Sequence, residues 1–127
     1  TEPFVVADDL VKPNGIIGTG NGKNLFIADI GGDKIFRYEI QADGHLTNKS
    51  LFAPMGSDGM TLDNKGNLYV TGKGVTIFDI NGRQITNIPI NEDWTANVCF
   101  GGKNGNELFI TASKGIYIMP MLVSRMK

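Results

Sequence analysis

A segment of about 40 residues recurs along this chain of 127 residues, and this repeat limits the fold more than any other feature. Its marker is a near-identical tetrapeptide, LFIA at 25–28, LYVT at 68–71 and LFIT at 108–111. Each copy is short, apolar and rich in β-branched or aromatic residues, which is typical of a buried strand. The chain is therefore predicted to contain three copies of one β-rich unit.

Further strands are predicted around each marker, separated by turns that contain glycine. Asp43-Gly44 and Asn81-Gly82 suit tight hairpin turns because glycine accepts a positive φ. A helical interpretation is disfavoured by 17 glycines and by prolines spread along the chain. The expected additional strands are 15–18, 34–40 and 46–52 in the first unit, 59–62, 75–80 and 84–90 in the second, and 98–100 and 116–121 in the third.

Four strands in about 40 residues is the pattern of a β-propeller blade, a twisted antiparallel sheet that stacks on its neighbours. The sequence predicts an all-β chain of about three four-stranded blades, at approximately 11–53, 54–90 and 91–127. Residues 4–10 are expected to be the outer strand of a preceding blade, because they come before Pro13-Asn14 as 46–52 come before Ser57-Asp58.

Propellers close with about four to eight blades, more than a chain of this length supplies. An open stack leaves apolar blade faces uncovered at both ends. Two solutions remain open: a homodimer of two copies, or a longer parent in which a missing N-terminal half completes the ring.

Composition argues against two classes of partner. The formal net charge is −1 and the lysines and arginines are scattered, so neither nucleic acid nor a membrane surface is an expected partner. No stretch reaches the roughly 20 apolar residues that cross a bilayer.

The single cysteine, Cys99, lies in the apolar run 98–100 and is expected to be a small buried hydrophobe. The compartment is not fixed by these features; the cytoplasm is slightly favoured over the periplasm or secretion.

Three polar residues occupy equivalent positions, ten or eleven residues before the leucine of each marker: Asn14, Asp58 and Asn97. In a propeller the innermost strands surround a central channel, so all three should face the same channel mouth. Carboxylate and amide oxygens suit calcium, magnesium or manganese. The alternative is that Asn and Asp before glycine only form turns.

The remaining histidine, His45, follows the turn glycine Gly44. No second histidine is present to complete a histidine-rich metal site. We expect His45 to be a solvated turn residue.

Several motifs in order resemble the senescence marker protein, gluconolactonase and luciferin-regenerating enzyme family. They are PNGI at 13–16, LFIAD at 25–29 followed by KIFRY at 34–38, SDGM at 57–60 followed by GNLYV at 66–70, and WTANVCFGG at 94–102. The resemblance covers nearly the whole chain.

The resemblance implies that this chain is half of a six-bladed propeller that hydrolyses lactones with one divalent cation in its channel. Calcium is the first choice for that cation, with magnesium, manganese or zinc as alternatives. Asn14 and Asp58 match two metal ligands of the family, and Asp58 also matches its candidate general base. Asn97 is expected from its repeat position alone to line the channel. The family's glutamate ligand, in a Glu-Gly-Pro motif, has no counterpart here, nor do the arginine and asparagine that position its substrate. The alternative is a non-catalytic propeller segment that serves as a protein-binding or structural module.

Overall fold

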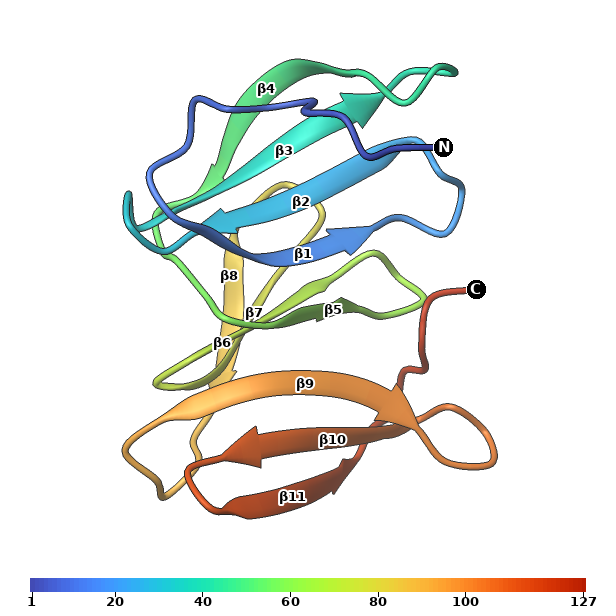
Figure 1. The fold of residues 1–127 in the computed structure, drawn as a ribbon. Helices are drawn as coiled ribbons and strands as arrows, with labels where there is room; N and C mark the ends of the chain where they lie inside the picture. Colours follow the sequence, from blue (N-terminus) through green and yellow to red (C-terminus); the bar gives the residue numbers. More distant parts are fainter.

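Eleven strands form three antiparallel sheets in the computed structural model, which describes residues 1–127 (Figure 1). The first sheet has the order β1 (Pro13–Gly18), β2 (Asn24–Asp29), β3 (Lys34–Ile40) and β4 (Leu46–Ala53). The second sheet has the order β5 (Met60–Leu62), β6 (Leu68–Gly72), β7 (Gly74–Phe78) and β8 (Gln84–Ile88). The third sheet contains β9 (Thr95–Gly101), β10 (Glu107–Ala112) and β11 (Gly115–Pro120). The predicted all-β class is confirmed, and the chain contains no helix that could cross a membrane.

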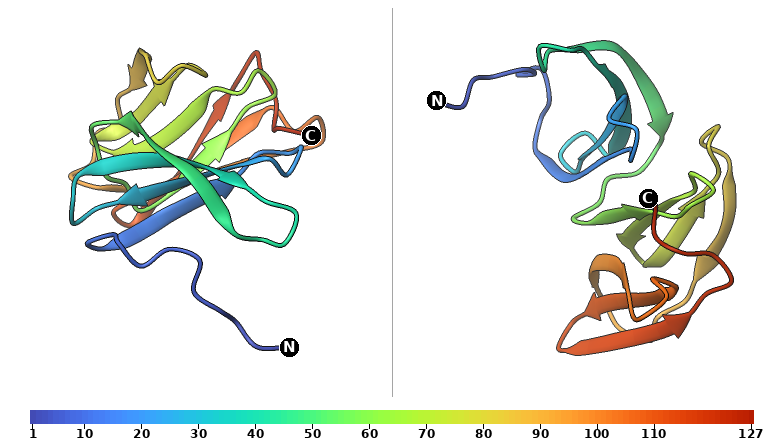
Figure 2. Two further views of the ribbon diagram at one scale, coloured as in Figure 1. Left: turned by 90° about the horizontal axis from the view of Figure 1, so that it is seen from above. Right: turned by 90° about the vertical axis from the view of Figure 1, so that its right-hand side faces the viewer.

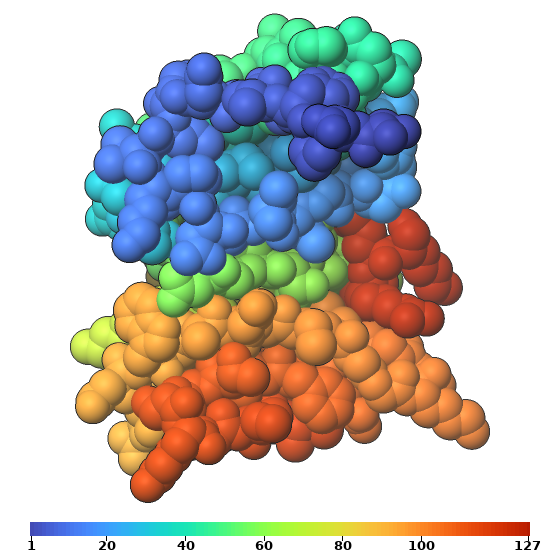
Figure 3. All heavy atoms as spheres, in the orientation of Figure 1, coloured from blue at the N-terminus to red at the C-terminus, as the bar shows by residue number.

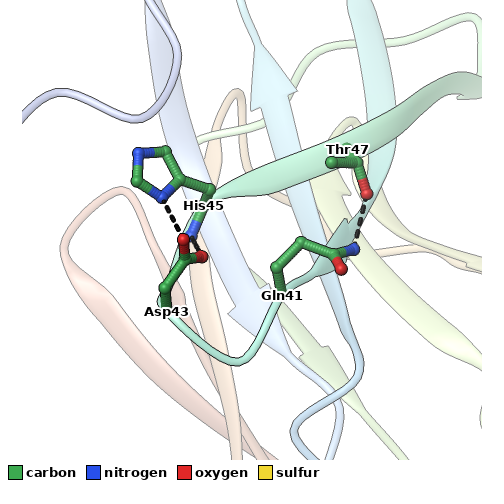
Figure 4. Close-up of polar contacts among 4 residues, drawn as sticks. All are labelled: Gln41, Asp43, His45 and Thr47. Atoms are coloured by element: carbon green, nitrogen blue, oxygen red, sulfur yellow. Dashed lines mark hydrogen bonds and ion pairs between the residues drawn. The ribbon is translucent and has the colours of Figure 1, made fainter.

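Short polar turns set the register of the hairpins. In the turn between β3 and β4, Gly44 adopts a φ of 90° and the Asp43 carboxylate accepts the backbone N–H of His45 at 3.0 Å. The His45 ring also lies 3.0 Å from Asp43, and its side chain is 60% exposed (Figure 4). A second polar contact, from Gln41 to Thr47 at 2.6 Å, spans the same turn. His45 is thus a solvated turn residue, as predicted.

The three sheets stack face to face, with the second sheet in the middle. Side chains alternate along β6, so Leu68 and Val70 pack against the first sheet while Tyr69 packs against the third. Leu68 has no exposed surface, and full burial of such a side chain stabilises the fold by about 1.5–3 kcal/mol. Figure 2 (right) shows the sheets following one another along an arc. Each interface therefore contributes its own apolar core.

The first strand of each sheet lies on the same side of this arc. The β1, β5 and β9 strands lie next to one another and run in the same direction in Figure 1. Their starting ends consequently gather at one end of the stack, and their finishing ends gather at the other. We call these the near end and the far end.

The C-terminal residues 121–127 connect all three sheets at the far end. Arg125 N–H donates to Gly105 O of the third sheet at 2.8 Å, and Asn64 N–H of the second sheet donates to Ser124 O at 2.8 Å. The N–H of Gly20, in the first sheet, lies 3.0 Å from the Met126 sulfur. Figure 3 shows this segment lodged between the first and third sheets.

Two expectations from the sequence concern residues 4–10 and Cys99. Residues 4–10 form no strand within this chain, because no strand of the chain lies along them to supply backbone hydrogen bonds. Asp9 pairs instead with Lys49 of β4 at 2.7 Å, and the assignment of this segment to a preceding blade stays a prediction. The expectation for Cys99 is wrong. Cys99 is exposed and not buried. It pairs with Phe109 on the outward face of the third sheet, which no further sheet covers.

Candidate functional site

The three predicted site positions lie at the near end, on neighbouring segments. Asn14 is the second residue of β1, Asp58 lies just before β5, and Asn97 is the third residue of β9. The N–H of Gly15, next to Asn14, donates to the carbonyl of Ser57, next to Asp58, at 3.1 Å. These contacts confirm that the repeat brings the first two segments together.

The third segment reaches Asp58 through Gly59. A Cβ atom added to Gly59 would clash with Asn97 Oδ1 and would lie 2.9 Å from Ala96 O. Only glycine allows β9 to pack this closely against the start of β5. Gly15 is similarly confined, since its Cβ would lie 3.0 Å from Ser57 O.

The free side-chain atoms differ among the three residues. Asp58 is half-buried and Asn14 is exposed, and neither side chain forms a hydrogen bond within the chain. The Asn97 Oδ1 atom, in contrast, accepts the N–H of Val98 at 2.9 Å and faces Gly59. Asn14 and Asp58 thus retain oxygen atoms that could bind a cation, whereas Asn97 uses its oxygen to shape β9.

A buried hydroxyl network fixes the backbone on both sides of Asp58. Ser57 Oγ and Thr71 Oγ1 lie 2.9 Å apart, and the N–H of Gly59 donates to both, at 3.2 and 3.1 Å. Thr71 Oγ1 also lies 3.1 Å from Ala96 O of β9. Sequence reasoning missed Ser57 and Thr71. The available signal was a threonine at a marker position where the first repeat has Ala28.

The entry to β1 is held by a second carboxylate, Asp29, at the end of β2. It accepts the backbone N–H groups of Val11 at 2.9 Å and Lys12 at 2.7 Å, just before Asn14, and that of Gly32 at 3.3 Å. The Val11 bond, followed by the others, lowers the pKa of Asp29 below its ordinary value, because these donors favour the charged form. Asp29 therefore positions the segment that carries Asn14.

A third carboxylate, Asp63, has no exposed surface and lies at the far end. Its oxygens accept the N–H groups of Lys65 and Asn67, the Asn67 side-chain amide and the Tyr69 hydroxyl, all at 2.9–3.0 Å. Burial, together with the neighbouring Asp63 charge, raises the pKa of Tyr69. Asp63 is satisfied within its own turn and is a structural residue.

The residues present fit a cation site only in part. No group of three or more His, Cys, Asp or Glu side chains lies close enough to hold a metal ion. The available donors at the near end are one carboxylate and one amide, both hard oxygen ligands. This donor set suits calcium, magnesium or manganese better than zinc, which prefers nitrogen and sulfur.

The stacked antiparallel sheets define a propeller-like all-β protein. The first strands of the sheets begin at one end of the stack, and the free polar side chains there form the candidate site. The sequence model of the SMP-30/gluconolactonase/LRE-like region matches residues 4–114, and the chain belongs to this family.

Three relatives illustrate the similarity. The gluconolactonase of Zymomonas mobilis is 26% identical over 121 residues, which is 84% of this chain and 34% of that protein. The structure of a gluconolactonase from Xanthomonas campestris matches with a TM-score of 0.80 at 28% identity, over 89% of this chain and 39% of that one. Regucalcin from Agrobacterium tumefaciens, described as a calcium-binding protein, has a TM-score of 0.79 at 20% identity, over 94% and 48% of the two chains. The chain therefore spans less than half of each relative.

Proposed function

We propose that this chain is part of a metal-dependent lactonase, in which its three sheets form half of a six-bladed propeller and the near end faces the substrate. The proposal rests on the positions of Asn14 and Asp58 at the beginnings of two adjacent strands. The side-chain oxygens of both residues accept no hydrogen bond from the chain. The gluconolactonase relatives support the choice of a lactone as substrate.

The proposed cofactor is one divalent cation, with calcium favoured because both available donors are oxygen atoms. The calcium-binding regucalcin supports this choice. Asn14 would contribute its amide oxygen and Asp58 a carboxylate oxygen. When bound, the cation would polarise the lactone carbonyl and offset the negative charge that develops on its oxygen.

Asp58 has a second role in this proposal, as the general base. Lactone hydrolysis needs a water molecule to attack the ring carbonyl and lose a proton as it does so. A carboxylate with a free oxygen can accept that proton if it lies within hydrogen-bonding distance of the water. The Ser57–Thr71 network holds the backbone on both sides of Asp58, which limits the positions that its carboxylate can reach.

Two side chains do not complete a calcium site, so water molecules, backbone carbonyls or groups outside these 127 residues must supply the rest. Calcium takes six to eight oxygen ligands, and the near end offers two side chains for it. The relatives are more than twice as long as the matched region, so additional sheets of a complete ring are a consistent source. We propose that such sheets, or a second copy of this chain, complete the site.

Substitution of Asp58 by Asn tests this function, because it keeps the shape of the side chain and removes its charge. We expect calcium-dependent hydrolysis of gluconolactone to fall by about 10²- to 10⁴-fold, the usual contribution of a general base. Calorimetry should show weaker calcium binding by the same variant. The control is Asp8→Asn, which changes an exposed aspartate with no hydrogen-bond partner and should leave both measurements unchanged.

An unchanged rate and unchanged calcium affinity in the Asp58→Asn variant would remove Asp58 from the proposed mechanism. If the completed ring, with the remaining sheets or a second copy of the chain present, neither binds calcium nor hydrolyses the lactone, the alternative of a non-catalytic propeller segment is favoured. If the proposal is correct, chelation of the metal with EDTA should abolish activity, and addition of excess calcium should restore it.

A further inference from the structure

A cavity lies at the far end, away from Asn14 and Asp58. It has a volume of about 560 Å³ and opens between the β1–β2 turn, the β5–β6 turn and the C-terminal residues. In Figure 1 both turns lie beside the C-terminal segment, at the side opposite the starts of β1 and β5. A volume of this size is within the range of small-molecule sites.

The cavity wall includes an arginine that has no acidic partner. Arg37, on β3, is half-buried, and its Nε donates to Asn24 Oδ1 at 3.2 Å. This bond fixes the guanidinium plane and leaves its terminal nitrogens without a partner in the chain. A guanidinium held in this way is preorganised for a carboxylate or phosphate group.

Three asparagines of the wall share one arrangement, in which the amide oxygen is hydrogen-bonded and the NH₂ group is free. The Oδ1 atom of Asn24 accepts from Arg37, that of Asn21 accepts the N–H of Lys23 at 3.0 Å, and that of Asn64 accepts the N–H of Ser124 at 3.3 Å. Each donor is an unambiguous N–H group, so the orientation of all three amides is determined. Their NH₂ groups form no hydrogen bond within the chain. The wall thus has unused donors.

The charge of the cavity wall also favours an anionic ligand. Arg37 is a basic group held in the cavity wall, and no aspartate or glutamate side chain lines the cavity. This is a local excess of positive charge in a chain whose formal net charge is −1. Phe26, Leu62 and Ile80 supply apolar wall.

From the unused donors, the fixed guanidinium and the lack of aspartate and glutamate side chains, we infer that the far-end cavity is a second binding site, for a small oxyanion. The ligand carries a carboxylate or phosphate group that pairs with Arg37. Its further acceptor atoms, such as sugar hydroxyls, take the asparagine NH₂ groups. This site is separate from the proposed lactonase centre and does not depend on it.

The test is titration of the ¹⁵N-labelled chain with three probes, inorganic phosphate, gluconate and glucose, in EDTA so that no metal-dependent binding contributes. We expect phosphate, gluconate or both to shift the amide signals of Gly20, Asn24 and Gly66, and glucose to have no effect. The responding probe identifies the group as phosphate or carboxylate. Equal shifts with glucose, or shifts with none of the probes at tens of millimolar, would overturn the inference.

Two variants distinguish specific binding in this cavity from a non-specific attraction of anions to positive charge. Arg37→Ala should weaken binding by at least about tenfold, since hydrogen bonds to charged groups are among the stronger ones. Arg83→Ala, which removes an exposed arginine outside the cavity, should leave affinity unchanged.

The Asn64→Asp variant tests the site without loss of folding, because a carboxylate can still accept the N–H of Ser124. It places a negative charge in the wall and should also weaken binding at least tenfold, with an unchanged melting temperature. Wild-type affinity in both Arg37→Ala and Asn64→Asp would contradict the proposed site.

Discussion

At the scale of single residues, the hydroxyl of Thr71 connects more of the candidate site than any charged group does. It lies within 3.1 Å of Ser57 Oγ, the backbone of Gly59 and the carbonyl of Ala96. These groups belong to the approach to β5 and to β9, and Thr71 itself lies on β6 with no exposed surface. The placement of Asp58 therefore depends on a neutral side chain.

Replacement of Thr71 by Val tests this dependence, since valine has a similar shape and cannot form the hydrogen bonds. We expect the free energy of unfolding to fall by about 1–3 kcal/mol, the cost of leaving buried polar groups unpaired. Calcium affinity should fall as well, because the backbone beside Asp58 loses its support. Urea unfolding and calorimetry measure the two effects.

The matched control is Thr86→Val on β8, where the threonine is exposed and forms no hydrogen bond. Valine suits a strand at least as well as threonine, so this variant should be neutral. A similar loss of stability in both variants would show that the Ser57–Thr71 network has no special role.

At the scale of elements, the position of β1 depends on a carboxylate at the end of β2. Asp29 is buried and holds the backbone at Val11 and Lys12. The pKa of Asp29 is lowered in the folded chain, first by the bond from Val11. The unfolded chain consequently binds a proton more readily as the pH falls.

Acidification should therefore destabilise this element. The contribution of Asp29 is complete above its unfolded pKa of about 4 and is lost as the pH falls through its lower folded value. Urea unfolding at several pH values between 7 and 3 should show stability falling below about pH 4, with a shallower fall in the Asp29→Asn variant. An identical slope in the two proteins would exclude Asp29 as a source of acid sensitivity.

Much of the strand arrangement is predictable from the repeat, because turn residues mark the ends of the strands. The prediction of 84–90 differs from β8 only at its end, where Pro89 cannot donate a ladder hydrogen bond. The location of Asn14 and Asp58 followed from equivalent positions in the repeat. The role of Thr71 did not, because it depends on which side chains meet between two sheets, and the path of residues 121–127 follows no local pattern.

At the scale of the whole molecule, the outward face of the third sheet is uncovered. Ile116 is 77% exposed and Ile118 is 55% exposed. Ile118 pairs with Phe109, which in turn pairs with the exposed Cys99. Exposed apolar patches of this kind mark association sites. A second copy of the chain is the proposed partner for the isolated 127 residues.

We expect the isolated chain to form a dimer in light scattering at micromolar concentration, and Ile118→Lys to shift it to a monomer by placing a charge on this face. Ile85→Lys is the control, because Ile85 is equally exposed but lies on β8 of the middle sheet. A wild-type monomer, or equal loss of association in both variants, would exclude this face as the contact.

The C-terminal residues 121–127 have a geometric consequence for any closed ring. Because they bond to far-end turns of all three sheets, they limit how far the sheets can fan apart at that rim. The angle between successive sheets determines how many sheets complete a circle. A change in the length of this short segment would therefore alter the curvature of the arc, and with it the number of sheets that could close, without any change inside a sheet.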